Sequence, residues 1–155
     1  SIVSHVMEPI CSIAVLNGPN LNMLGMREPD IYGHQTLADI EAECRRLASK
    51  KKLEIDWYQS NLEGDLITKI QSLAGSVDWI VINAAGLTHT SVALRDALSL
   101  FPGSVIEVHL SNIHARETFR HTSLISAIAK GVIAGFGATS YYMAIDAISH
   151  LHLET

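Results

Sequence analysis

Runs of apolar residues alternate with amphipathic segments along the whole chain. Four short segments are largely apolar, as is typical of parallel strands buried on both faces; they are residues 13–16, 79–82, 105–110 and 132–136. The segment Leu-Glu-Ile-Asp-Trp-Tyr at 53–58 instead alternates apolar and polar residues, which indicates a strand with one exposed face or at a sheet edge. The pattern therefore predicts five strands, with the alternating strand at an edge.

Apolar residues recur at helical spacing between the predicted strands. The predicted helices cover residues 36–52, 61–75, 90–100 and 123–130, and a last one starts near 139. Thr36 with Asp39 three residues later has the spacing of a capping box, and Asn61 is predicted to cap the second helix. Strand and helix thus alternate five times.

This alternation is typical of an α/β sandwich with a parallel sheet and right-handed crossovers. With the alternating strand at an edge, we predict a flavodoxin-like, three-layer fold with strand order 2-1-3-4-5. No repeat or linker interrupts residues 11–155, which are expected to form a single domain. Residues 1–10 are expected to be an N-terminal extension or a remnant of cloning, with Met7 as the natural start.

Composition narrows the function. The formal net charge of −5 argues against a nucleic-acid surface. Only 17% of residues are charged and 48% are hydrophobic, so we expect part of the surface to be buried between subunits. Cys11 and Cys44 form no close-spaced pair. No segment has the roughly 18 apolar residues of a membrane span, and the N-terminus lacks the basic region of a secretory signal. We therefore expect a cytoplasmic protein.

The connection between the first strand and the first helix is unusually long. It covers residues 17–35, whereas such connections usually take roughly 2 to 6 residues. Its polar side chains Asn20, Arg27 and Tyr32 are candidates for contact with a ligand. A phenol near the Arg27 cation would have a pKa below its ordinary value of about 10, which makes Tyr32 a candidate base.

Other polar residues follow the third and fourth strands, where ligands bind in open α/β sheets. These residues are Asn83, His89, Glu107, His109, Ser111, Asn112, His114, Arg116 and Arg120. Glu107 and His109 are two residues apart on a strand and share a face. Either His109 is a general acid with Glu107 tuning the local charge, or Glu107 is simply paired with an arginine.

Several other chemistries are disfavoured. Gly135 and Gly137 lack the third glycine of a dinucleotide loop, and the chain has no Gly-x-Ser-x-Gly elbow or phosphate-binding loop. The spacing of His109, His114 and His121 matches no common metal site. None of the five lysines lies beside the expected site, so an imine mechanism has no candidate. What remains is proton chemistry without a cofactor, suited to removing a proton beside a carbonyl with loss of water.

Six ordered motifs resemble those of the type II 3-dehydroquinate dehydratases. They are Asn-Gly-Pro-Asn-Leu-Asn at 17–22, Leu-Gly-Met-Arg-Glu-Pro at 24–29, Tyr-Gly at 32–33, Thr-His-Thr-Ser-Val-Ala-Leu-Arg-Asp-Ala at 88–97, Glu-Val-His-Leu-Ser-Asn at 107–112 and Phe-Arg-His at 119–121. The family usually has a proline and an aromatic in the turn after Asn83, where Ala-Ala-Gly-Leu stands here.

The resemblance implies dehydration of 3-dehydroquinate to 3-dehydroshikimate without cofactor or metal. It implies that Tyr32 removes the C2 proton, Arg27 keeps Tyr32 deprotonated, Asn20 holds a water at the enolate and His109 protonates the departing hydroxyl. The implied substrate-binding residues are Asn83, His89, Arg120, the backbone amides of Leu110 and Ser111, and Asp96 from a neighbouring subunit of a dodecamer built from trimers.

Two non-catalytic alternatives compete with this interpretation. One is a flavodoxin-like module that binds a small polyhydroxy acid. The other, an acidic response regulator, is weaker because Asn83 stands where the third strand would end in a phospho-accepting aspartate. A binding module needs neither an acid nor a base, so Tyr32, Arg27 and His109 favour the enzyme.

Overall fold

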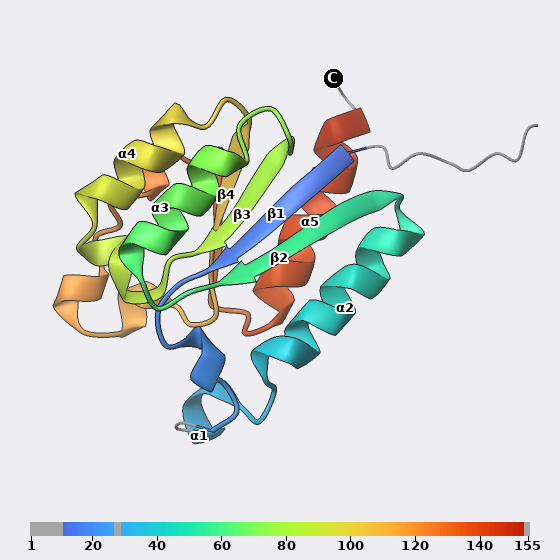
Figure 1. Cartoon of the computed structure of the whole chain (residues 1–155). Coiled ribbons are helices and arrows are strands. Elements are labelled where there is room, and N and C mark those ends of the chain that lie inside the picture. Colours follow the sequence, from blue (N-terminus) through green and yellow to red (C-terminus); the bar gives the residue numbers. More distant parts are fainter. Residues whose placement is uncertain (1–10, 27–28, 154–155) are drawn as a thin grey trace, which may run out of the picture.

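A parallel sheet of five strands forms the centre of the molecule (Figure 1). The computed structural model describes residues 11–26 and 29–153, and its strand order is β2-β1-β3-β4-β5, as predicted. The strands are β1 (Cys11–Asn17), β2 (Leu53–Gln59), β3 (Trp79–Asn83), β4 (Ser104–His109) and β5 (Gly131–Ala134). The alternating segment is the edge strand β2, where Leu53 and Ile55 are buried and Glu54 is exposed.

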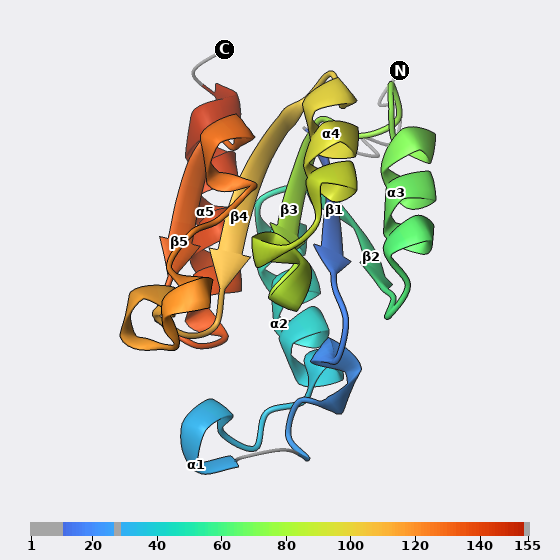
Figure 2. The same cartoon turned by 90° about the vertical axis from the view of Figure 1, so that its left-hand side faces the viewer.

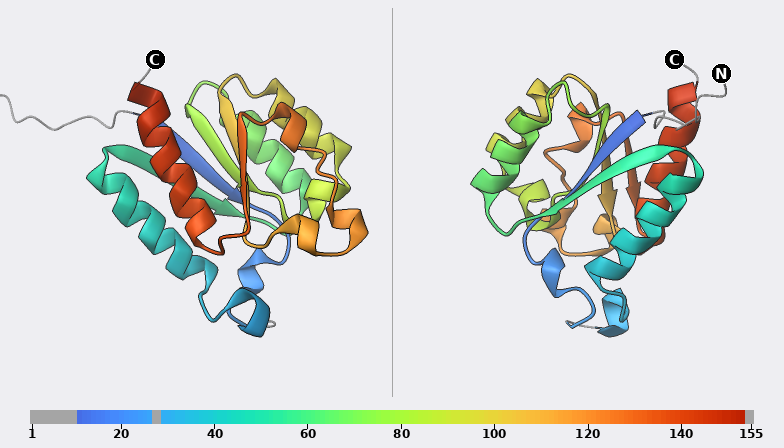
Figure 3. Two further views of the ribbon diagram at one scale, coloured as in Figure 1. Left: turned by 180° about the vertical axis from the view of Figure 1, so that it is seen from behind. Right: turned by 45° about the vertical axis from the view of Figure 1, so that its right-hand side comes forward.

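Helices cover both faces of the sheet. α2 (Leu37–Lys50) and α5 (Thr139–Leu153) lie on one face, side by side in the rear view of Figure 3, and α3 (Glu63–Ser72) and α4 (Val92–Leu100) lie on the other. Shorter helical segments are η1 (Leu21–Met23), α1 (Pro29–Tyr32), η2 (Ala85–His89), η3 (Ile113–Ala115), η4 (Thr118–Arg120) and η5 (Ser126–Ile128). Among the described helices, none is long and apolar enough to cross a membrane.

The two faces of β1 explain its unbroken apolar sequence. Ile13 and Val15 pack in the layer formed with α2 and α5, while Ala14 and Leu16 pack in the layer formed with α3 and α4. All four side chains are fully buried, so a strand of this kind cannot alternate with polar residues. The capping box of Thr36 and Asp39 is also confirmed.

Two local predictions are wrong. Residues 123–130 form only the short η5, because their backbone groups bond to other elements: Leu124 N donates to Thr88 O, and Leu124 O accepts from Arg95. Asn61 does not cap α3, whose N-cap is Leu62; its side chain instead accepts a hydrogen bond from Asn20 N. In both cases tertiary partners outweigh local preference.

Candidate active site

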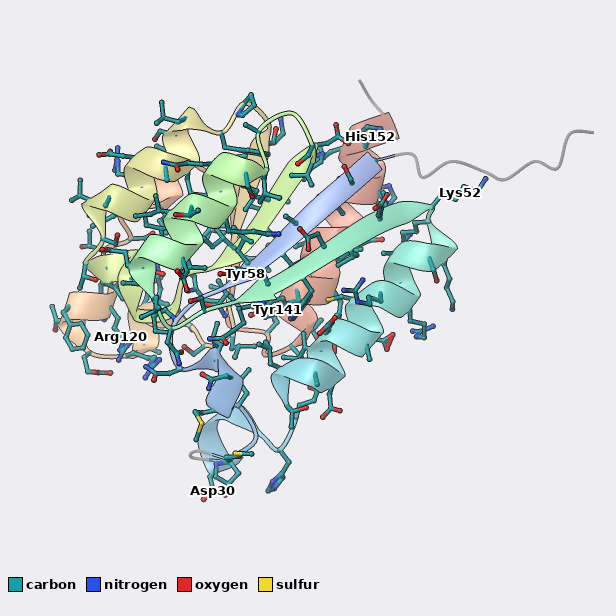
Figure 4. The ribbon with its side chains drawn as sticks, viewed as in Figure 1. Asp30, Lys52, Tyr58, Arg120, Tyr141 and His152 are labelled. Atoms are coloured by element: carbon teal, nitrogen blue, oxygen red, sulfur yellow. The ribbon has the colours of Figure 1, made fainter. Side chains whose placement is uncertain are left out.

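A cavity of about 520 Å³ opens at the carboxyl ends of β1, β3 and β4. Seven of the predicted site residues line it: Asn20, Asn83, His89, His109, Leu110, Ser111 and Arg120. Figure 4 shows Arg120 at the end of the molecule toward which the strand arrows point. The sheet therefore brings together side chains from three separate connections, as the strand order predicted.

Four predicted site residues lie elsewhere or outside the described part of the chain. Glu107 is fully buried and is not in the cavity wall, and Asp96 is exposed on α4. Arg27 lies outside the described residues. The backbone of Tyr32 ends α1, which stands beyond the carboxyl ends of the strands in Figure 2, but the Tyr32 side chain lies outside what the structure describes.

His109 and Glu107 form a buried pair at the end of β4. The His109 Nε2 donates to Glu107 Oε2, and the His109 residue is 5% exposed at the cavity wall. Ser123 Oγ donates to the same carboxylate oxygen at 2.9 Å and Ser126 Oγ to the other at 2.7 Å. Among the described residues the ion-pair partner of Glu107 is His109 and not an arginine.

The surroundings of Glu107 keep its carboxylate ionised. Burial by itself raises the pKa of this group, but the hydrogen bonds from His109, Ser126 and Ser123 and the charge of His109 outweigh burial and hold the pKa below its ordinary value. Because Glu107 binds Nε2, the other ring nitrogen of His109 remains to face a ligand in the cavity.

Replacing Ser126 with alanine is expected to lower the free energy of unfolding at neutral pH by about 1–3 kcal/mol, because the change removes a hydrogen bond to a buried carboxylate. The folded-state pKa of Glu107 lies below the unfolded value of about 4.3. The carboxylate therefore stabilises the fold above that value, and this contribution is lost as the pH falls through the depressed folded pKa.

Urea unfolding at neutral and acidic pH measures this effect. The difference between wild type and Ser126→Ala should be largest at neutral pH and should shrink in acid. Ser99→Ala is the matched control, since in the described contacts the exposed Ser99 hydroxyl hydrogen-bonds only the Arg95 carbonyl of the same helix. A loss for Ser126→Ala that is the same at every pH would contradict the assigned role.

Asn20 adopts a left-handed backbone conformation at the cavity wall. Its φ of 72° is one that asparagine tolerates better than most residues. The Asn20 N–H donates to Asn61 Oδ1 at 2.9 Å, and Gln59 Nε2 donates to the same Asn61 oxygen at 3.2 Å and to Gly18 O at 3.1 Å. The side chains of Gln59 at the end of β2 and Asn61 just after it thus fix the turn that carries Asn20.

Gly18 lies where the connections after β1 and β3 cross. Its N–H donates to Asn83 O at 2.8 Å, and an added Cβ would lie 2.5 Å from Ala84 O. Gly18→Ala is therefore expected to destabilise the fold by about 1–3 kcal/mol, since backbone and not a flexible side chain must move.

Thermal unfolding tests the Gly18 prediction. Gly64→Ala serves as the control, because a Cβ at this α3 position meets nothing within 4 Å and a helical glycine gains stability on becoming alanine. The two variants should shift Tm in opposite directions. An unchanged Tm for Gly18→Ala would show that the crossing is not tight.

Asn83 and His89 stand at opposite ends of the turn after β3. The Asn83 Oδ1 accepts from Ala85 N at 3.1 Å, and Ala85 has a φ of 52° in this turn. The His89 Nδ1 donates to Thr122 O at 2.8 Å, and its Nε2 has no partner among the described residues. Both side chains are thereby held in one orientation at the cavity wall.

Cationic side chains from the connection after β4 line the remaining wall. Arg116 and Arg120 both face the cavity, and Arg120 Nε donates to Glu117 Oε1 at 3.1 Å. The Arg120 guanidinium also lies 4.9 Å from the centre of the Phe119 ring. These cations suit an anionic or hydroxyl-rich ligand. In the described part of the chain, no group of three or more His, Cys, Asp or Glu residues is arranged to hold a metal ion.

Sequence reasoning missed Ser123, Ser126, Asn17 and Tyr141. The serines bind Glu107, while Asn17 and Tyr141 hydrogen-bond each other beneath the cavity. A buried glutamate needs donors, which was a signal for the serines, but they fell in a segment predicted to be helical. Nothing in the local sequence indicates the contact between Asn17 and Tyr141.

The arrangement combines a buried acid–base pair with hydrogen-bond donors and cations around one cavity. All five lysines of the chain lie in described residues and none lines the cavity. The described wall therefore offers proton transfer and charge stabilisation, and no lysine amine for an imine.

Comparison with known proteins gives consistent matches along almost the whole chain. The family model described as "Dehydroquinase class II" matches residues 11–149. The 3-dehydroquinate dehydratase of Dinoroseobacter shibae is 56% identical over 140 residues, covering 90% of this chain and 93% of the relative, and that of Brucella canis is 54% identical over 143 residues, covering 92% and 91%. The crystal structure of a type II dehydroquinase from Butyrivibrio crossotus superposes with a TM-score of 0.87 at 44% identity, covering 89% of this chain and 97% of that one.

Proposed function

This chain belongs to the class II dehydroquinase family, and from that premise we propose that it is a hydro-lyase that converts 3-dehydroquinate to 3-dehydroshikimate. The reaction serves the shikimate route to aromatic amino acids or the breakdown of quinate. It removes a proton beside a ketone and expels the hydroxyl one carbon further on.

The observation that carries this proposal is the pairing of His109 with Glu107 at the cavity wall. A binding module has no use for a buried carboxylate that is held ionised by two serine hydroxyls behind a histidine. A histidine that acts as general acid does, because the carboxylate holds the imidazole ring in one orientation toward the cavity.

In the proposed first step Tyr32, as phenolate, removes the proton from C2 of the substrate. Arg27 keeps Tyr32 deprotonated through its positive charge. The enolate oxygen that forms is stabilised by a water held by Asn20, whose backbone is fixed at the cavity wall by Asn61. No metal and no imine takes part.

In the proposed second step His109 protonates the C1 hydroxyl as it leaves as water. Asn83, His89 and Arg120 bind the substrate hydroxyls, and the backbone amides of Leu110 and Ser111 bind the carboxylate. The position of these five residues around one cavity supports the assignment. Glu107 acts through His109 and does not itself touch substrate.

An absorbance assay tests the function. The product is a conjugated enone carboxylate that absorbs in the near ultraviolet, so its formation after addition of 3-dehydroquinate is followed directly. The assay is run on untreated enzyme and on enzyme incubated with substrate and borohydride, which reduces an imine and traps it on lysine.

Product in both samples is the expected result. Loss of product only after borohydride would mean that a lysine forms an imine, and the proposed mechanism would be wrong. No product in either sample would reject the enzyme and favour a module that binds a small polyhydroxy acid.

We propose further that the enzyme is a dodecamer assembled from trimers, in which Asp96 reaches the site of a neighbouring subunit. Asp96 lies on the same exposed face of α4 as Val92 and Leu100, which are 59% and 80% exposed. An apolar face of this kind is typical of a protein interface. Sedimentation at the mass of a single chain would reject the assembly.

We also place the enzyme in the cytoplasm. Cys11 and Cys44 are both free thiols and both buried, which suits a reducing compartment. Recovery of the native protein from the secreted fraction of its host would contradict this location.

A further inference from the structure

A chain of buried hydrogen bonds runs beneath the cavity from the edge of the sheet to Asn83. Asn17 Nδ2 donates to Tyr58 O at 3.1 Å, Tyr141 Oη donates to Asn17 Oδ1 at 2.7 Å, and Asn83 Nδ2 donates to Tyr141 Oη at 3.0 Å. Tyr58 and Tyr141 are labelled in Figure 4. The chain thus connects β2, β1, α5 and β3.

In this series of hydrogen bonds the donor and acceptor of each bond are fixed, because each bond restricts the next one. The Tyr58 carbonyl can accept a hydrogen bond from the nitrogen of the Asn17 amide but not from its oxygen. The Asn17 amide oxygen therefore faces Tyr141. The Tyr141 hydroxyl has a single proton, which goes to that oxygen. Tyr141 therefore only accepts from Asn83, whose amide nitrogen must face it.

Burial holds Tyr141 in this role. Tyr141 and Asn17 are 0% exposed, and burial raises the pKa of the Tyr141 hydroxyl, so it keeps its proton.

Among the described contacts, one N–H of the Asn83 amide has no partner. Its first N–H is held by Tyr141 and its oxygen accepts from Ala85 N, while Asn83 itself lines the cavity and is 3% exposed. The second N–H remains for a ligand. If the Asn83 side-chain amide were flipped, its oxygen would face the ligand and its nitrogen would face the Ala85 N–H. Two hydrogen-bond donors would then face each other, which is unfavourable.

We propose that Tyr141 is a positioning residue for substrate recognition: through the proton it gives to Asn17, it fixes the Asn83 amide so that an N–H donor, and not the carbonyl, faces the substrate. The proposal rests on the proposed function, in which Asn83 binds a substrate hydroxyl. Tyr141 touches no substrate, and its effect passes entirely through Asn83.

The test is a set of kinetic measurements on Tyr141→Phe, Asn83→Ala and the double variant. Tyr141→Phe is expected to raise KM for 3-dehydroquinate about tenfold with a smaller change in kcat, since one oriented hydrogen bond to substrate is lost. Tyr142→Phe is the matched control, because the neighbouring Tyr142 hydroxyl only accepts from Gln35 at 3.3 Å on the surface of α5. Its KM should stay at the wild-type value.

The double variant separates positioning from general destabilisation. If Tyr141 acts through Asn83, adding Tyr141→Phe to Asn83→Ala leaves KM unchanged while Tm falls further. A further tenfold rise of KM in the double variant, or a normal KM in Tyr141→Phe alone, would overturn the proposal. If Tyr141→Phe does not fold, Asn17→Ala removes the acceptor of the same proton and is combined with Asn83→Ala in the same way. Absence of turnover in the wild-type enzyme would instead reject the proposed function.

Discussion

Exchange of His109 for glutamine is expected to lower kcat for 3-dehydroquinate by about 10²- to 10⁴-fold, the usual contribution of a general acid. Glutamine has a similar length and can still hydrogen-bond Glu107, but its amide cannot deliver a proton to the departing hydroxyl. The loss should appear in kcat more than in KM, because proton transfer to the leaving group occurs only in the transition state.

Steady-state kinetics with the absorbance assay measures this loss. His150→Gln is the control, since His150 is exposed at the end of α5 and pairs only with Asp146 in the described contacts. Its kcat should equal that of wild type. A near-normal kcat for His109→Gln, in protein whose Tm is unchanged, would remove His109 from the role of acid.

Replacing Tyr32 with phenylalanine should have a similar effect, again about 10²- to 10⁴-fold in kcat, because the proposed base is removed. The backbone of α1 places residue 32 beyond the carboxyl ends of the strands, on the side where the cavity opens. The fold should be intact, since phenylalanine differs from tyrosine only by the hydroxyl group.

Arg27→Ala distinguishes a phenolate base from other roles of Tyr32. If Arg27 is the cation beside Tyr32, as proposed, its loss leaves the Tyr32 phenol to ionise nearer its ordinary pKa of about 10, so the rising limb of the kcat–pH profile should move to higher pH. Tyr58→Phe is the control, because the Tyr58 ring packs under Lys69 away from the cavity wall. A normal kcat for Tyr32→Phe, or an unmoved pH profile for Arg27→Ala, would show that the base is misassigned.

The strand order could be predicted because burial leaves a direct signature in sequence. Residues 13–16 of β1 and 79–82 of β3 are covered on both faces and are all apolar, while β2 has an exposed face and alternates. Once the edge strand is known, the rule that ligands bind at the carboxyl ends of parallel strands places Asn20, Asn83 and His109 at one cavity. These features follow from periodicity, which is local.

What could not be predicted depends on partners that are distant in sequence. Ser126 is predicted to be helical because the apolar residues around it have helical spacing. In the structure its hydroxyl donates to the Glu107 carboxylate, 19 residues earlier in the sequence. Tyr141 bonds a residue 124 positions away. A side-chain hydrogen bond across the fold leaves no periodic trace, so the second layer of the site is visible only in three dimensions.

The tight crossing at Gly18, just after β1, also affects the rate of deamidation at Asn17. Asn17 and Gly18 form an Asn-Gly pair, in which the glycine nitrogen readily attacks the asparagine side chain and expels ammonia when the chain is flexible. Here the Gly18 nitrogen donates a hydrogen bond to Asn83 O. The nitrogen and the oxygen of the Asn17 side-chain amide are both hydrogen-bonded, and Asn17 is fully buried. Deamidation at Asn17 therefore proceeds only in molecules whose first strand end has opened, and its rate in storage measures how often that opening occurs.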